Sequence, residues 1–155
     1  DFNSSIDDLP DSIVSISLYY RFQQSINKLP SNLINFKLGS SYPHPINCWP
    51  ENIKTVDLCD NYHLVEGLPP YLEKLIIQYP DSFKSPLLNM PINLKYLEFG
   101  AVNINQLCAV LPPYLEILQI ARLYINYFGE KLDYKDIPST LKDIEVTKTL
   151  FAESE

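Results

Sequence analysis

Apolar residues recur along this chain at fixed distances after a proline. In seven copies an apolar residue precedes the proline, and apolar residues follow three, six and eight positions after it, so that none of these twenty-one later slots is polar. The second and third slots are two residues apart, which is the period of a β-strand. The pattern therefore predicts one short strand in each copy. The expected strands are 15–19, 35–39, 55–59, 74–78, 96–100, 117–121 and 143–147.

The spacing of the prolines predicts how the strands are joined. Repeats begin at about residues 9, 29, 49, 68, 90, 111 and 137, after a partial repeat over 1–8. A period near 20 residues is typical of a stacked solenoid, in which each repeat contacts only its neighbours. A return path of about ten residues is too short for a crossover helix. We therefore predict one domain over 1–155, with a parallel sheet of about seven short strands on one face, extended or 3₁₀ backs, and little or no α-helix.

A second apolar signal lies in the back half of the repeat. An aromatic residue lies about twelve positions after the proline, and an aliphatic residue or Phe follows about four positions later. These residues are predicted to fill the core behind the sheet, because only a buried position has a physical reason to stay apolar in every copy. The aromatic residues are Phe22, Tyr42, Tyr62, Phe83 and Tyr124, and the later ones are Ile26, Ile46, Leu87, Leu107 and Phe128.

Composition and charge exclude several classes of function. The chain has 155 residues, of which 46% are hydrophobic and 20% charged, as in a soluble folded protein. Twelve Lys and Arg against 19 Asp and Glu give a net charge of −7, which leaves no basic surplus for nucleic acid. No apolar run reaches the roughly 18 residues that a membrane span needs.

The cysteines and the N-terminus bear on location. Three cysteines without a C-x-x-C spacing do not form a disulfide framework, so reduced thiols in the cytoplasm are the simplest interpretation. No signal peptide is visible. The chain lacks an initiator Met and begins within a repeat, which favours a segment of a longer protein.

Recognisable catalytic chemistry is missing from the sequence. There is no G-x-G-x-x-G, P-loop, G-x-S-x-G or H-E-x-x-H motif. The stretch 57–63 contains Asp, Cys and His, but it lacks the ligand spacing of a metal site, and four residues across a turn seldom align Cys59 with His63 as nucleophile and base. We therefore predict no catalytic residue, no cofactor and no metal site, and a protein that is not an enzyme.

A short phrase precedes several strand blocks. It reads Phe2-Asn3-Ser4-Ser5-Ile6, Phe22-Gln23-Gln24-Ser25-Ile26, Tyr42-Pro43-His44-Pro45-Ile46 and Phe83-Lys84-Ser85-Pro86-Leu87. With the Leu-Pro-x-x-Leu-x-x-Leu-x-Leu blocks, the chain resembles the FNIP type of leucine-rich repeat over about residues 2 to 148. The resemblance implies a leucine-rich-repeat solenoid. The blocks are also similar to repeats of bacterial secreted ubiquitin-ligase effectors, but only Asn61 matches the asparagine that those repeats carry after the strand.

FNIP repeats are known mainly from social amoebae and from giant viruses of amoebae, where they often follow an F-box. The resemblance therefore implies the substrate-recognition region of a receptor for a cullin-type ubiquitin ligase. It also implies a cytoplasmic location, in the host if the chain is viral. No F-box-like segment lies within these 155 residues, so this implication rests on analogy between family members.

The residues between the repeat leucines are predicted to point outward, because strand side chains alternate between faces. They vary from copy to copy while the core positions do not, which suits a face that binds a protein partner. The alternative is a surface that is merely solvated. The predicted partner-binding residues are Ser17, Tyr19, Tyr20, Asn35, Lys37, Asp57, Lys74, Ile76, Gln78, Tyr96, Glu98, Ile117, Gln119, Arg122, Asp143 and Glu145.

Within this face, tyrosines are the expected anchors, since Tyr is enriched at interface hot spots. They are Tyr19, Tyr20, Tyr96 and Tyr79. Ile76 and Ile117 are expected to form an exposed apolar patch on neighbouring strands.

The sequence leaves other binding modes open. Acidic residues in the C-terminal half favour a basic partner there. The long sixth unit offers a loop over 126–136 as another binding site. The alternative function is a structural protein that self-associates through its solenoid ends into a homodimer.

Overall fold

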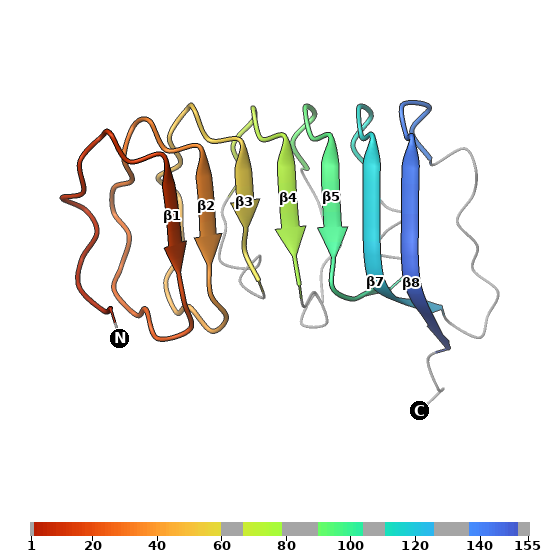
Figure 1. Cartoon of the computed structure of the whole chain (residues 1–155), viewed down its shortest axis with the longest axis horizontal. Coiled ribbons are helices and arrows are strands. Elements are labelled where there is room, and N and C mark those ends of the chain that lie inside the picture. The colour runs from red at the N-terminus through yellow and green to blue at the C-terminus, as the bar shows by residue number, and fades with distance from the viewer. Residues whose placement is uncertain (1, 60–66, 79–89, 104–110, 126–136, 152–155) are drawn as a thin grey trace.

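The computed structural model describes residues 2–59, 67–78, 90–103, 111–125 and 137–151. These residues form one sheet in which all the paired strands are parallel, and none of them is helical (Figure 1). No helix long and apolar enough to cross a membrane occurs in the described ranges. The strands are β1 (Ser15–Leu18), β2 (Asn35–Leu38), β3 (Thr55–Asp57), β4 (Lys74–Ile77), β5 (Tyr96–Phe99), β6 (Val102–Asn103), β7 (Ile117–Ile125) and β8 (Asp143–Phe151).

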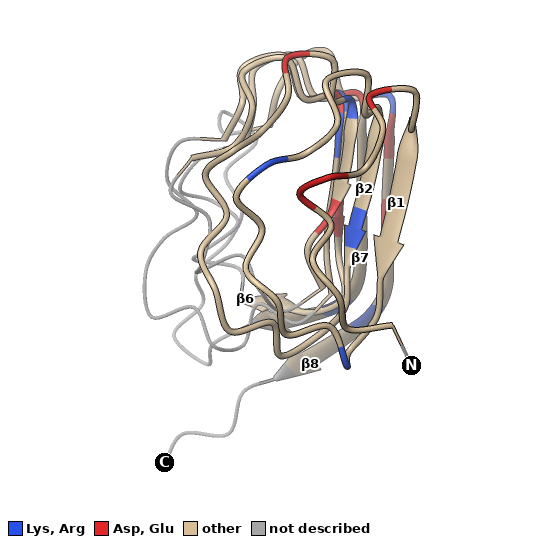
Figure 2. Ribbon diagram, turned by 90° about the vertical axis from the view of Figure 1, so that its left-hand side faces the viewer, with Lys and Arg blue, Asp and Glu red and all other residues tan. Residues whose placement is uncertain are grey.

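The strands stack in the order of the repeats, which confirms the predicted solenoid. The order is β1-β2-β3-β4-β5-β7, and β8 pairs with β7. The sheet forms one side of the coil and the return segments form the other (Figure 2). The first residues of the seven repeat strands lie side by side in one column, as the repeat spacing predicts: Ser15, Asn35, Thr55, Lys74, Tyr96, Ile117 and Asp143.

The repeat proline forms a turn at the entry to each strand. In all seven copies the N–H of the third residue after the proline donates to the proline carbonyl, at 3.0–3.3 Å. One residue later the chain joins the sheet. The carbonyl of Val14, for example, accepts the N–H groups of both Ile34 (2.9 Å) and Asn35 (3.0 Å) from the next coil. Proline, which has no N–H to donate, therefore stays outside the ladder.

The repeat leucines and their equivalents form the core, as predicted, in the first six copies. Seventeen of their eighteen slots are buried, and Ile13 is partly buried. The seventh copy differs. Ile144 is 47% exposed and Val146 37% exposed, although they pair in register with the buried Leu118 and Ile120. The prediction that all seven triplets are buried is therefore wrong at β8, which pairs with β7 alone among the described strands.

Strands β1, β2, β4 and β5 end one residue before the predicted position, and β3, β7 and β8 depart from the prediction by more. β3 stops at Asp57 because Cys59, two residues later, adopts a left-handed conformation (φ 55°) that no strand continues through. β7 and β8 run for nine residues each, beyond the predicted 121 and 147. The extensions of β7 and β8 pair with each other, and that of β7 also pairs with the short strand β6, which the sequence pattern did not predict. The residues from Ala121 to Ile125 contain no proline or glycine to end the strand.

The backs of the first two complete coils are extended and pack inward, as predicted. Phe22, Ile26, Tyr42 and Ile46 are at most 3% exposed. The rings of Phe22 and Tyr42 stack with centroids 6.0 Å apart. Tyr42 donates its hydroxyl to a backbone carbonyl, and burial raises its pKa to about 12. Tyr124 instead lies half-buried in β7, and the predictions for Tyr62, Phe83, Leu87, Leu107 and Phe128 fall outside the described residues.

The partial repeat at the N-terminus is tied to the coil that follows. The carboxylate of Asp7 accepts hydrogen bonds from the backbone N–H of Asn27 (3.0 Å) and Lys28 (3.2 Å) and from the Asn27 side chain (2.8 Å). These bonds hold the pKa of Asp7 below its usual value. Its folded pKa is therefore below its unfolded pKa, so its stabilising contribution is present above the unfolded value and lost as pH falls through the folded one.

Candidate interaction surface

The predicted partner-binding residues lie on the outer face of the sheet or at the end where its strands finish. All of them except Asp57 are exposed or half-buried. We call the outer side of β1–β5, β7 and β8 the sheet face. Exposed members are Ser17, Tyr19, Tyr20, Asn35, Lys37, Arg122, Asp143 and Glu145, and half-buried members are Lys74, Ile76, Gln78, Tyr96, Glu98, Ile117 and Gln119. Asp57 is only 6% exposed.

Tyr96 is the centre of a side-chain network on the sheet face. The Lys74 ammonium lies 3.8 Å from the centroid of its ring, a cation–π contact between adjacent strands. Its hydroxyl lies 2.8 Å from Glu98 Oε2 and contacts Gln119 Oε1. Burial, with the nearby Glu98 carboxylate, raises the pKa of Tyr96 to about 12. The phenol therefore stays protonated at neutral pH and serves as a donor.

The network continues across the C-terminal strands as an acidic surface. Gln119 donates from Nε2 to Glu145 Oε2 at 3.3 Å. A hollow of about 120 Å³ lies between β5, β7 and β8, with Glu98 and Glu145 on its sides. Asp143 is exposed at the start of β8. Contacts thus join side chains from four adjacent strands, β4, β5, β7 and β8.

The Asp57 carboxylate is buried and bonded to other groups of the protein, so it is not exposed to solvent. Its Oδ2 lies 2.6 Å from Lys37 Nζ, and its Oδ1 accepts the backbone N–H of Cys59 at 3.2 Å. The hydrogen bond to Asp57 raises the pKa of Lys37. Because Cys59 is the residue with φ 55°, Asp57 stabilises the bend that ends β3. The expectation that Asp57 is exposed on this face is therefore wrong, whereas Lys37 remains exposed.

The two outward isoleucines do not form the predicted patch. Ile76 lies on β4 and Ile117 on β7, and β5 runs between them. Ile76 pairs with Glu98 and Ile117 with Tyr96, so polar groups of the network separate them. Both are half-buried. The strands of the fourth and sixth repeats are not neighbours, because the strand of the fifth repeat lies between them.

Tyr19 and Tyr20 lie together at the end of β1, 69% and 60% exposed. Arg21 lies over the Tyr20 ring (5.3 Å from guanidinium carbon to centroid), and its Nε donates to the Tyr20 hydroxyl at 2.9 Å. Both rings are exposed, as predicted, and their role as anchors stays a prediction. Tyr79 and the loop over 126–136 lie outside the described residues.

A second feature, which the sequence analysis missed, lies where the chain enters the strands. We call this side of the solenoid the turn edge. The fourth residue after the repeat proline alternates in charge over five coils, and most neighbours form ion pairs: Lys54–Glu73 (3.0 Å), Glu73–Lys95 (3.4 Å) and Glu116–Lys142 (2.6 Å). The sequence signal for this feature is the alternation of Lys and Glu at a fixed offset from the repeat proline.

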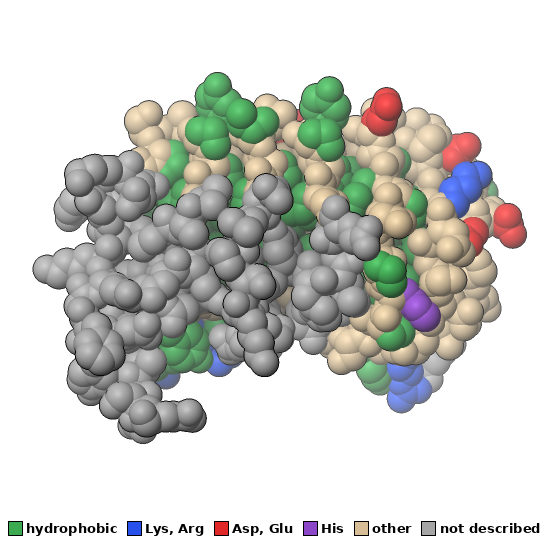
Figure 3. Space-filling model, turned by 180° about the vertical axis from the view of Figure 1, so that it is seen from behind, with side chains coloured by type: hydrophobic (Ala, Val, Ile, Leu, Met, Phe, Trp, Pro, Cys, Tyr) green, Lys and Arg blue, Asp and Glu red, His purple; other side chains and the backbone are tan. Residues whose placement is uncertain are grey.

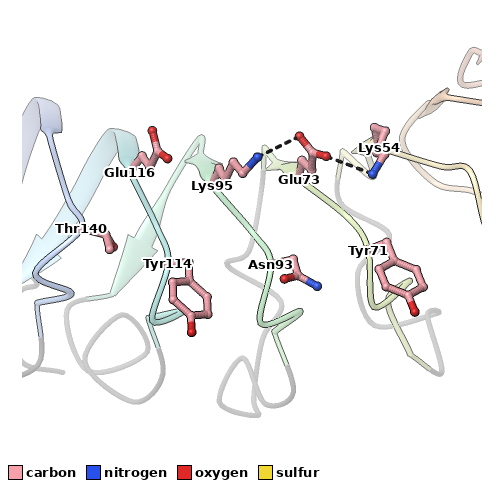
Figure 4. A pocket seen from close by; sticks show the side chains of 8 residues that line it. All are labelled: Lys54, Tyr71, Glu73, Asn93, Lys95, Tyr114, Glu116 and Thr140. Carbon is pink, nitrogen blue, oxygen red and sulfur yellow. Dashed lines mark hydrogen bonds and ion pairs between the residues drawn. The ribbon is translucent and has the colours of Figure 1, made fainter.

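Beside this charged row runs a groove of about 620 Å³. Tyr71, Asn93 and Tyr114 lie in line along it, one from each of three successive coils (Figure 4). The two tyrosines are 58% and 56% exposed. Hydrophobic side chains project from this same upper edge in the view from behind (Figure 3).

No group of three or more His, Cys, Asp or Glu side chains that could hold a metal ion occurs among the described residues. His63, of the Asp57–His63 stretch, lies outside them, as does Cys108. Comparison with protein-family models, with curated proteins and with solved structures finds no match for this chain. The chain is thus a parallel β-solenoid, and its resemblance to FNIP repeats stays a prediction from the sequence.

Proposed function

We propose that this solenoid is a non-enzymatic module that binds a protein partner on its sheet face. The observation that carries the proposal is the network centred on Tyr96, which holds Lys74, Glu98, Gln119 and Glu145 in fixed positions. Side chains that are already ordered lose little conformational entropy when a partner binds. Tyr is also a frequent anchor at protein interfaces.

Charge identifies the kind of partner that suits this face. Lys37 is neutralised by Asp57, and Lys74 lies over an aromatic ring. Glu98, Asp143 and Glu145 leave the C-terminal half acidic, so that a segment rich in Lys or Arg is complementary to it. With the resemblance to FNIP repeats, this supports a cytoplasmic substrate receptor of a cullin-type ubiquitin ligase as the finer form of the proposal.

The test is a comparative pull-down from amoebal lysate with identification by mass spectrometry. The parent chain is compared with a Tyr96→Ala, Glu98→Lys, Glu145→Lys variant and with a Glu51→Lys control, which reverses an exposed charge away from the sheet face. A basic protein that is retained by the parent and the control but lost by the triple variant is the expected result. Circular dichroism and thermal unfolding establish that the variants are folded.

The partner is then purified and its affinity measured as a function of salt. Exposed charges act mainly through long-range attraction, so the affinity is expected to fall as ionic strength rises. Equal capture by the parent and the triple variant would contradict binding on the sheet face. An affinity that does not change with salt concentration would contradict the proposal that the partner is basic.

A second function, self-association through the solenoid end, is favoured by a specific observation. Ile144 and Val146 occupy core positions of β8 yet are substantially exposed, and β8 pairs on one side only among the described strands. A strand with an unpaired edge is a template for pairing with another chain. Two copies that meet at β8 would cover these side chains and extend the sheet.

Light scattering after size-exclusion chromatography decides this second proposal. The parent is expected to increase in apparent mass with concentration, and an Ile144→Asp, Val146→Asp variant is expected to remain monomeric. Val14→Asp is the matched control, because Val14 is also apolar and 49% exposed but lies at the turn edge beside β1. A parent chain that stays monomeric at every concentration would contradict self-association through β8.

A further inference from the structure

The groove on the turn edge repeats a tyrosine at every second coil. Tyr71 and Tyr114 are both the second residue after their repeat proline, and Asn93 occupies the same position in the coil between them. Both rings are more than half exposed. Asn93 is held by a hydrogen bond from its side-chain amide to the carbonyl of Pro70 (3.0 Å). The second position after the proline therefore lies in the same turn in three successive coils, and only the side chain at that position differs.

The strand spacing fixes how far apart the two tyrosines lie. Tyr71 enters β4 and Tyr114 enters β7, and β5 lies between these strands. Two steps of about 4.8 Å place equivalent residues about 9.6 Å apart. A polyproline II helix has three residues per turn and rises about 9.3 Å per turn, so residues i and i+3 on one side of it match this spacing.

Other peptide conformations match less well. In a β-strand, residues i and i+3 point to opposite faces, and i and i+2 are only about 6.7 Å apart. In an α-helix, the next residue on the same face at this distance is i+7, at about 10.5 Å, on a rod that is about 10 Å wide. A polyproline II segment is narrow, preformed and lined by carbonyls that have no internal donors. The hydroxyls of Tyr71 and Tyr114 are donors of the required kind.

The charge of the groove favours the same ligand. Its charged lining residues are Lys54, Glu73, Lys95 and Glu116, two of each sign. Ion pairs join Glu73 to both lysines, and Glu116 pairs with Lys142. The groove therefore carries no net charge, in a chain whose net charge is −7. An uncharged occupant complements a neutral wall, because a charged one would have to displace an existing ion pair.

We propose that this groove binds a proline-rich segment in the polyproline II conformation, with its residues i and i+3 packed on Tyr71 and Tyr114. Aromatic grooves that recognise such segments exploit their preformed, low-entropy conformation. This site lies on the turn edge and is independent of the sheet face, so that either proposal can fail without the other.

The test is a titration of the ¹⁵N-labelled chain with a blocked decaproline peptide, followed by amide chemical shifts. A Gly-Ser decamer and an alanine-rich helical peptide of the same length are the comparison ligands. Saturable shifts with decaproline alone, which cluster at the coils of Tyr71, Asn93 and Tyr114, are expected.

Four variants link the shifts to the two rings. Tyr71→Ala and Tyr114→Ala are each expected to weaken decaproline binding by about tenfold, the size of a favourable aromatic contact. Tyr71→Phe, which keeps the ring, is expected to weaken it less. Phe2→Ala removes an aromatic ring of similar exposure (59%) at the other end of the chain, outside both proposed binding sites, and is expected to change nothing.

Three outcomes would overturn the proposal. They are the absence of saturable binding at millimolar decaproline, binding that survives both alanine substitutions, and equal binding of the helical peptide. Thermal unfolding of each variant identifies any loss that comes from the fold, and Tyr71→Phe keeps the test decisive in that case, because it preserves the packing of the ring.

Discussion

Replacing Gly100 by alanine is expected to lower the free energy of unfolding by about 3 kcal/mol, at the upper end of the range for overpacked sites. A Cβ built on Gly100 would lie 1.8 Å from the carbonyl oxygen of Gln78, which belongs to the backbone of the preceding coil. No side-chain rotation relieves that contact, so two coils have to separate. Gly100 also donates its N–H to Ile77 at 2.9 Å, a bond that the separation would weaken.

Urea unfolding monitored by circular dichroism measures this effect. The matched control is Ala121→Ser, in the same column of the next coil, where a Cβ is already accommodated and the residue is exposed. The control is expected to stay within about 0.5 kcal/mol of the parent. Equal stability of Gly100→Ala and the parent would show that the coils separate at this point at little cost.

Replacing Phe36 by alanine is expected to cost about 4 kcal/mol, as for other buried aromatic residues. Phe36 is 1% exposed, and its ring meets Trp49 edge-on with centroids 5.6 Å apart. Removing it leaves a cavity between the second and third coils. In a solenoid each coil is stabilised mainly by its neighbours, so the damage should stay local.

Native-state hydrogen exchange distinguishes local from global loss. Amides of β1 to β3 are expected to lose protection first, while those of β5, β7 and β8 keep theirs. Ile34→Ala, which shortens a 40% exposed side chain two residues away, is the control and is expected to alter protection little. Uniform loss of protection across the sheet would contradict the nearest-neighbour description of this fold.

The sequence predicted the register of the sheet and most of its core, because both follow from local periodicity. Residues such as Phe36 and Leu97 recur at a fixed offset from a proline, and that offset places them in one column of a parallel stack. The turn at each proline is also local. Its hydrogen bond spans three residues and is repeated in every copy.

Features that depend on non-local contacts were not predictable in this way. The burial of Asp57 results from an ion pair with Lys37, twenty residues away, and from the left-handed Cys59. The exposure of Ile144 results from its place at the end of the sheet rather than from its place in the repeat. For the candidate site, the strand alternation predicted that Tyr96, Lys74, Glu98, Gln119 and Glu145 point outward, but not the contacts that join them, because those contacts link residues on different strands.

The doubled hydrogen bond at the start of each strand makes the repeats interchangeable. Every described coil joins its predecessor through the same two N–H groups, regardless of which side chains it carries. A unit cut between two successive repeat prolines could thus be duplicated or deleted without altering the joints on either side. The sheet would lengthen or shorten by one strand spacing of about 4.8 Å. A partner of fixed size would then sense the number of copies, which makes copy number a means of changing recognition without any substitution.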